Sequence, residues 1–181
     1  MNLDVSQLLF PKVYYYEYVQ SIDSTITSII LPNWTCNDIN YTIFDFSRFT
    51  QVESIEIGDD SFSSVQTFKI DGLNRLKTIK IGKNSFTQVK QGWFDSGHTA
   101  EEWDSKVNNQ SKSFHILNCE SLESIQIGEC SFSDYGGEFE LKNLPQLQSI
   151  QIGTIGSDSC NFSNSSFVIE GIDIVLYICN A

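Results

Sequence analysis

Basic residues are scarce in this chain. It holds 11 lysines and arginines against 23 aspartates and glutamates, which leaves a formal net charge of -12 at pH 7. Nucleic acids and anionic membranes are bound through clustered positive charge, because phosphate groups dominate those interfaces. The one basic stretch falls between residues 69 and 90 (Lys69, Arg75, Lys77, Lys80, Lys83 and Lys90). We therefore expect no nucleic-acid partner.

Long apolar runs are also lacking. No stretch reaches the roughly 20 apolar residues of a membrane-spanning helix, so we expect no membrane insertion. The N-terminal sequence MNLDVSQLLFPK has Asp4 where a secretion signal carries positive charge, and Pro11 ends its apolar run early. Five Asn-x-Ser/Thr triplets favour a surface setting only mildly, at Asn33, Asn40, Asn109, Asn161 and Asn164. Cytoplasmic and cell-surface locations both stay open.

Cysteines are few, odd in number and widely spaced. The chain has five of them and no CxxC pair, which argues against a disulfide framework and against a zinc site. We expect free thiols packed in the core.

An internal repeat is the strongest signal in the sequence. Apolar residues at relative positions 0, 3 and 5 return five times. Their third members are Leu31, Ile57, Ile81, Ile127 and Ile152, separated by steps of 26, 24, 46 and 25 residues. In LKTIKIG, Ile79 and Ile81 point to one face and Thr78 and Lys80 to the other, as in a half-buried strand. One such strand cannot bury its apolar face alone, whereas stacked copies can.

A second short strand is expected in each unit. Pairs of an aromatic and an aliphatic residue separated by one position recur at Phe68 and Ile70, and at Phe139 and Leu141. The same spacing returns at Phe167 and Ile169. A long 3.6-residue period is missing from the units. The pattern predicts a mostly β solenoid with little helix.

Two units also place Asn or Cys three residues after the third apolar position and a phenylalanine two residues later. Asn84 with Phe86 and Cys130 with Phe132 show this spelling. On these residues the chain resembles leucine-rich-repeat proteins, closest to the surface-type repeats of bacteria and protists. The resemblance covers roughly residues 22 to 181. It implies a right-handed solenoid with a parallel concave sheet and short convex strands.

Two features depart from the common leucine-rich pattern. Isoleucine occupies most strand positions, and a glycine follows the strand directly at Gly58, Gly82, Gly128 and Gly153. These departures leave the subfamily open.

We expect one solenoid domain over residues 1–181. Residues 1–21 fit the frame poorly and are expected to form an irregular N-terminal cap. Val175 and Ile178 begin another strand and the chain stops at Ala181, which predicts a truncated final repeat or an exposed strand edge.

The step of 46 residues contains an insertion at about 90–112. A hidden repeat would need an apolar residue at position 104, which is Asp104. Within the insertion, Thr99 and Glu102 form a capping box that predicts one short helix, with Trp103 and Val107 on one side.

Cys130 and Cys160 share a local spelling, ECSF against SCNF, and are expected in the same inward turn column. A disulfide between them is the less favoured alternative to two packed thiols.

The sequence shows no group of residues whose types and spacing suit catalysis or metal binding. The two histidines, His98 and His115, are expected at the surface, without a neighbouring nucleophile. The outward strand columns hold one carboxylate, Glu56, so no acid/base pair forms there. We therefore expect no catalytic residues, no metal ligands and no cofactor. A β-helix carbohydrate-active enzyme with two facing carboxylates stays a remote alternative.

The outward columns do suggest a binding surface. One column is small and polar, with Ser28, Ser54, Thr78, Ser124 and Ser149, and the next varies. Candidate ligand-binding residues are the varying side chains and the insertion's aromatic residues, namely Glu56, Lys80, Gln126, Gln151, Trp93, Phe94 and Trp103. Glu56 and Lys80 are expected to form a lateral ion pair. The bland alternative for the aromatic residues is packing onto the flank of the solenoid.

The sequence thus predicts a non-catalytic protein-interaction or adhesion module. Its partner is expected to be a protein or a surface glycan, and the chain acts as a monomer or as part of a longer repeat array. The second hypothesis is a structural spacer within a larger repeat scaffold.

Overall fold

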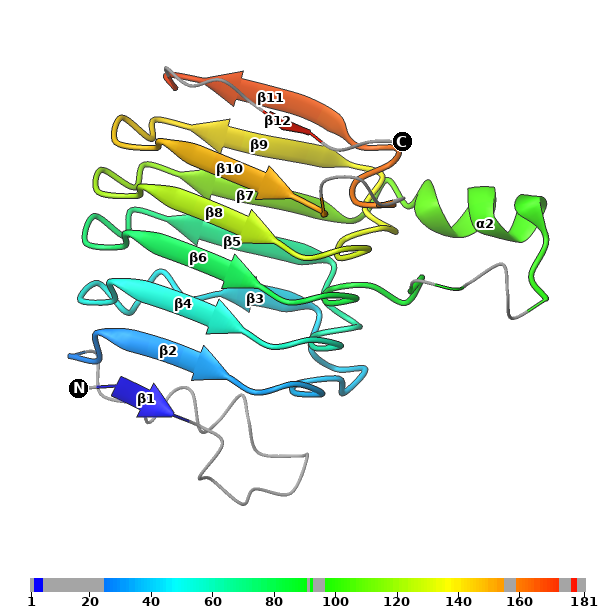
Figure 1. Cartoon of the computed structure of the whole chain (residues 1–181), viewed down its shortest axis with the longest axis horizontal. Helices are drawn as coiled ribbons and strands as arrows, with labels where there is room; N and C mark the ends of the chain where they lie inside the picture. The colour runs from blue at the N-terminus through cyan, green and yellow to red at the C-terminus, as the bar shows by residue number, and fades with distance from the viewer. Residues whose placement is uncertain are drawn as a thin grey trace.

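Two parallel β-sheets face each other across a core of apolar side chains. The computed structural model describes residues 2–4, 25–90, 92, 97–154, 159–172 and 177–178, with backbone alone for 2–4 and 177–178. The strands stack as a parallel β-solenoid of about five turns, with 31% strand and 6% helix (Figure 1). The predicted mostly β solenoid is confirmed at this level. No helix among these residues is long and apolar enough to cross a membrane.

From β2 to β12 the described strands alternate between the two sheets. Sheet A has seven strands in the order β1 (Asn2–Asp4), β2 (Ser28–Leu31), β4 (Ser54–Ile57), β6 (Thr78–Ile81), β8 (Ser124–Ile127), β10 (Ser149–Ile152) and β12 (Tyr177–Ile178). Sheet B has five, in the order β11 (Ser166–Glu170), β9 (Glu138–Lys142), β7 (Ser113–Leu117), β5 (Thr67–Asp71) and β3 (Ile43–Asp45). The insertion carries the helix α2 (Ala100–Val107).

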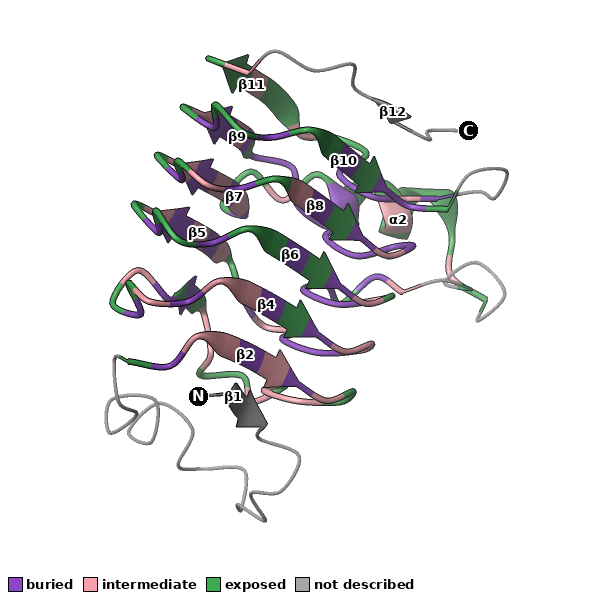
Figure 2. Ribbon diagram, turned by 60° about the vertical axis from the view of Figure 1, so that its left-hand side comes forward, coloured by how far each residue is buried: buried purple, intermediate pink, exposed green. Residues whose placement is uncertain are grey.

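The repeat frame coincides with the strand register of sheet A. Successive third positions pair directly with one another, from Leu31 opposite Ile57 to Ile127 opposite Ile152. All of these side chains are buried, and the residues between them point outward, so burial alternates along each strand (Figure 2). The row of isoleucines is therefore the interior face that the sequence predicted.

Stacked phenylalanines fill the rest of the core. One column comes from sheet B, where Phe68 and Phe114 lie 4.7 Å apart, and a second comes from the turns, where Phe86 and Phe132 lie 4.7 Å apart. Rings of the two columns meet edge to face, as Phe114 and Phe132 do at 5.1 Å. These are favourable geometries for aromatic pairs. Each ring contacts its copy in the next turn, which couples neighbouring turns energetically.

The turns after the sheet A strands adopt unusual backbone conformations. Asn84 and Cys130 have φ near 53°, and Phe86 and Phe132, two residues later, have φ of 58° and 57°. A phenylalanine in the left-handed region is disfavoured by its Cβ. The strain is offset because this conformation directs each ring into the stacked core, where it is fully buried.

The glycines that follow β4, β6 and β8 are required by close approach between turns. A Cβ placed on Gly128 would lie 2.6 Å from the backbone carbon of Gly82, and one on Gly82 would lie 2.6 Å from that of Gly58. Real Cβ contacts are essentially never that short. The recurring Ile-Gly step is thus a packing requirement of the solenoid.

One sequence-based expectation is wrong: Cys130 and Cys160 are joined by a disulfide, with Cα atoms 4.8 Å apart. The stacking places the two cysteines in adjacent turns at a separation typical of disulfides. Cys119 is a buried thiol, as predicted.

The chain ends are described only in part. Residues 2–4 of the predicted N-terminal cap form β1, which pairs in parallel with β2. The rest of the predicted cap, residues 1 and 5–21, lies outside the described residues, and so does Val175. Ile178 belongs to β12, which pairs with β10.

Gly128→Ala should lower the free energy of unfolding by about 1–3 kcal/mol, because the new methyl group must push two stacked turns apart. Chemical denaturation followed by circular dichroism measures the change. Gln126→Ala, on the exposed face of the same strand, is the control and should change stability by less than about 0.5 kcal/mol. Equal stability of both variants would show that the turns do not need the glycine.

Candidate interaction surface

The outer face of sheet A is polar and regular. Its small column runs through Ser54, Thr78 and Ser124, and its variable column through Glu56, Lys80, Gln126 and Gln151. All four members of the variable column are exposed. The structure therefore brings together the four candidate residues that the sequence assigned to this face.

Ion pairs link neighbouring strands on this face. Lys80 Nζ lies 2.9 Å from Glu56 Oε1, which confirms the predicted lateral pair. A second pair joins Lys77 to Glu53 at 2.9 Å, and its hydrogen bond lowers the pKa of Glu53 and raises that of Lys77. Exposed pairs contribute little to stability because water and salt screen them. These charges are available to a ligand at small energetic cost.

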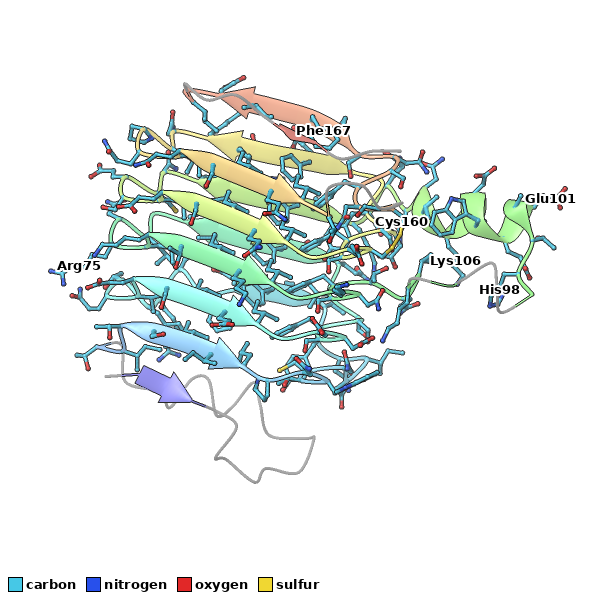
Figure 3. All side chains as sticks on the ribbon, in the orientation of Figure 1. Arg75, His98, Glu101, Lys106, Cys160 and Phe167 are labelled. Carbon is cyan, nitrogen blue, oxygen red and sulfur yellow. A yellow bond between two sulfur atoms is a disulfide. The ribbon has the colours of Figure 1, made fainter. Side chains whose placement is uncertain are left out.

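Helix α2 stands out from the solenoid beyond the ends of the strands (Figure 1). Its N-terminus has the predicted capping box: Thr99 Oγ1 accepts from the Glu102 backbone N–H, and Glu102 Oε2 accepts from the Thr99 N–H. The Thr99 hydrogen bond lowers the pKa of Glu102. His98, Glu101 and Lys106 mark this arm in Figure 3. We call residues 97–110 the α2 arm.

Of the three aromatic candidates on the insertion, the structure describes Trp103. Trp103 is half-buried on α2, one turn before the fully buried Val107. Trp93 and Phe94 lie outside the described residues. The exposed surface of the helix is mainly acidic, with Glu101, Glu102 and Asp104.

A buried ion pair fixes the base of the arm. Lys112 Nζ lies 2.8 Å from Asp134 Oδ2, and both side chains are almost fully buried. The same oxygen accepts from the backbone N–H of Gln88 at 3.2 Å, so Asp134 binds the chain on both sides of the insertion. Within the described part of the chain, Asp134 Oδ1 is buried without a hydrogen-bond partner. Lys112 is therefore the charged partner of Asp134 in this buried position.

Two glycines complete this base. The N–H of Gly136 donates to the Asn109 carbonyl and that of Gly137 to the Lys112 carbonyl, both at 3.0 Å. A Cβ on Gly137 would lie 2.5 Å from the Lys112 oxygen, so the turn can approach this closely only with glycine. The turn that follows β8 is thus hydrogen-bonded to the C-terminal end of the α2 arm. Nothing in the spacing of residues 88, 112 and 134 could have predicted this arrangement.

An exposed tryptophan that the sequence did not single out lies in the turn after β2. Trp34 is 69% exposed, and Lys90 Nζ lies 5.0 Å from the centre of its ring. Lys90 also pairs with Asp60 at 2.6 Å. Because Lys90 begins the insertion, Trp34 adds an aromatic surface next to the point where the insertion leaves the stack. Its place in a turn, outside the strand columns, gave no pattern to follow.

Two side chains that could act as nucleophiles, Cys119 and Tyr135, are both buried. Burial raises the pKa of the Cys119 thiol to about 11, so the thiolate nucleophile is suppressed at neutral pH. Burial also raises the pKa of Tyr135, whose hydroxyl donates to the Val65 carbonyl at 2.9 Å. Among the described residues, neither side chain contacts a base that would activate it.

A group of possible metal ligands lies on the outer face of sheet B. The ligand atoms of His115, Glu138 and Glu140 all lie within 4.8 Å of one another. Both oxygens of Glu140 already have partners, since His115 Nδ1 is 2.8 Å from Oε2 and Lys142 Nζ is 2.6 Å from Oε1. Lys142 is the main cause of the lowered pKa of Glu140. These contacts make the cluster a polar network that links β7 to β9.

No family model, curated protein or solved structure matches this chain. The described residues form a parallel β-solenoid from which the α2 arm projects.

Lys112→Ala should lower the free energy of unfolding by about 3 kcal/mol or more, because it leaves the Asp134 charge buried and unpaired. Replacing both residues, as Lys112→Met with Asp134→Leu, should recover most of the loss. Denaturant titration measures both variants, and Lys106→Ala on the exposed side of α2 is the control. A small loss for Lys112→Ala would contradict the buried-pair assignment.

Proposed function

We propose that this chain is a non-catalytic interaction module that binds a protein partner through the α2 arm. The observation that supports this most is the construction of the arm's base. A buried ion pair and two closely packed glycines hold a helix whose acidic side chains point into solvent. Stacking alone needs no such arm, because the strands before and after it pair in the same register as elsewhere.

The chemistry of the surface indicates the kind of partner. The exposed side chains of α2 include Glu101, Glu102 and Asp104, and the whole chain carries a net charge of -12. A basic protein surface would be attracted to such an arm and would associate faster at low salt. Trp103 and Trp34 offer the aromatic contacts that commonly anchor interfaces.

The face of sheet A is suited to a supporting role in binding. Glu56, Lys80, Gln126 and Gln151 offer hydrogen bonds and charge but no apolar anchor. Contacts of this kind fix orientation and contribute modest affinity. Adhesion through many such faces would arise by avidity if several modules act together.

The finer fold assignment belongs to the same proposal. We assign the solenoid to the leucine-rich-repeat type and to the right-handed form. The residues at the Asn/Cys position of the repeat adopt the left-handed backbone that asparagine tolerates well, with φ near 53° at Asn84 and Cys130. Parallel strand crossovers are right-handed in nearly all folds, which supports the handedness.

A structural spacer is the second candidate. The regularity of the Ser/Thr column and of the isoleucine row favours it, because these features serve stacking and carry no recognition. The two candidates differ in what the arm contributes.

Replacing residues 98–104 by a short Gly-Ser linker, which removes the exposed part of the arm but keeps Val107, Lys112 and Asp134, separates the candidates. For an interaction arm, stability should fall by less than about 1 kcal/mol, because the residues removed are exposed or half-buried. Trp103→Ala should behave similarly, whereas Val107→Ala should cost about 2 kcal/mol as a buried control on the same helix. A loss above about 3 kcal/mol on deleting the arm would favour the spacer.

Binding is tested with a displayed library of basic peptides selected on the wild-type protein. Peptides of the proposed class should lose at least tenfold in affinity for the linker variant and for Glu101→Lys with Asp104→Lys. They should be unaffected by Gln146→Ala, an exposed neutral position in the turn before β10. Equal affinity for the wild type and for the linker variant would contradict the arm as the site.

A further inference from the structure

Two interior strands of sheet B bring three side chains with metal-binding groups together. β7 and β9 are neighbours in the sheet, with β5 and β11 on their other sides (Figure 2). His115 lies opposite Glu140 in the parallel register, and Glu138 lies on the same face of β9 as Glu140. The ligand atoms of all three side chains lie within 4.8 Å of one another. Backbone pairing between two strands therefore sets the spacing of the group.

The three donors suit a zinc-type cation. Zinc binds imidazole nitrogen and carboxylate oxygen, whereas magnesium and calcium take oxygen ligands. Donor atoms on one zinc ion lie about 3–3.5 Å apart, because each is about 2.0–2.2 Å from the metal. His115 Nδ1 and Glu140 Oε2 are already 2.8 Å apart. Glu138 is exposed, so its side chain can rotate through the short distance that closes the set.

The charge around the group favours a cation. Glu138, Glu140 and Glu170 lie on the same face of β9 and β11, and Lys142 lies among them. Lys142 Nζ is 2.6 Å from Glu140 Oε1 and 3.7 Å from Glu170 Oε2, so one ammonium serves two of the carboxylates. Within the described part of the chain, Glu138 has neither an ion pair nor a hydrogen bond. The group therefore holds more negative charge than its neighbours balance.

The strand on the other side of His115 contributes a cation that is already paired. Lys69 lies opposite His115 on β5, and its Nζ is 3.4 Å from Asp71 Oδ2. The side chains of His115 and Glu140 are 20% and 13% exposed, so water screens their charges only in part. The attraction between the carboxylates and a bound cation is therefore stronger than at a fully exposed site.

We propose that His115, Glu138 and Glu140 bind a divalent zinc-type cation on the outer face of sheet B. The ion replaces the hydrogen bond between His115 and Glu140, and neutral imidazole is the form of histidine that binds it. Lys142 withdraws from Glu140, because the bound cation balances the carboxylate in its place. Three protein ligands leave a coordination position for water. The bound ion connects β7 to β9, so it adds a link between two turns of the solenoid.

Metal binding at this position would reverse the sequence-based expectation of no metal ligands. That expectation rested on the outward columns of sheet A and on the lack of a nucleophile beside either histidine. His115 and Glu140 meet only through the register of sheet B. The group shares no residue with the α2 arm, so its test is independent of the proposed function.

Isothermal titration calorimetry with ZnCl₂ tests the site on the untagged, disulfide-intact protein after treatment with a chelator. The wild type should bind Zn²⁺ saturably, and His115→Gln and Glu138→Gln should each weaken binding at least tenfold. His98→Gln is the matched control and should leave the affinity unchanged, because His98 also lies beside a glutamate, with Nδ1 3.5 Å from Glu102 Oε2. Wild-type binding no tighter than millimolar, or equal effects of His98→Gln and His115→Gln, would overturn the proposal.

Lys142→Gln distinguishes a metal site from a polar network that only links strands. Removing the competing ammonium should tighten zinc binding several-fold, because both oxygens of Glu140 then become available to the ion. Thermal unfolding gives a second readout: ZnCl₂ should raise the Tm of the wild type and of Lys142→Gln and leave that of His115→Gln unchanged, since a bound ion stabilises the folded state by mass action. Circular dichroism checks that each variant folds.

Nuclear magnetic resonance of the wild type gives a readout free of substitutions. The ring signals of His115 should shift or broaden on addition of ZnCl₂ before those of His98. Changes confined to His98, or weaker zinc binding by Lys142→Gln, would contradict the assignment.

Discussion

Every turn of this protein depends on its neighbours to bury its apolar strand. A four-residue strand such as β6 exposes one apolar face, and the turn that follows carries one phenylalanine in a strained backbone conformation. Neither feature is stable alone. When turns stack, the isoleucines form a buried row and the phenylalanine rings pack in two columns. The glycines let the backbones of neighbouring turns approach closely. Stability is then a sum of contacts between adjacent turns.

This dependence explains where function can reside. The sheet faces and turns repeat, so their side chains are constrained mainly by stacking. The insertion between β6 and β7 escapes the constraint, and the chain anchors it with the pair of Lys112 and Asp134. In the proposed function, this departure from regularity presents side chains to a partner.

The sequence predicted the features that recur. The spacing of Ile57, Ile81 and Ile127 was sufficient to place them in one row, because a period-two pattern repeated at a fixed interval admits few arrangements. The helix α2 was predicted from its capping box, which is a local signal. The pair of Glu56 and Lys80 followed from the register. These inferences need only neighbouring residues or aligned repeats.

The sequence did not predict features that depend on single contacts across turns. The disulfide of Cys130 and Cys160 was the less favoured alternative, because the sequence placed both residues in one column but did not give the distance between them. Lys112 and Asp134 belong to no repeated pattern, so their pairing was invisible. Trp34 lies in a turn outside the aligned columns. The glycines were noted only as a departure from the leucine-rich pattern, whereas the distances between turns show that they permit close approach.

Native-state hydrogen exchange tests the dependence of each turn on its neighbours most directly. In Gly128→Ala, the amides of β8 should exchange faster, and so should those of β6 and β10 on either side, while β2 changes least. Acceleration confined to β8, with β6 and β10 unchanged, would show that the turns are independently stable and would contradict the account.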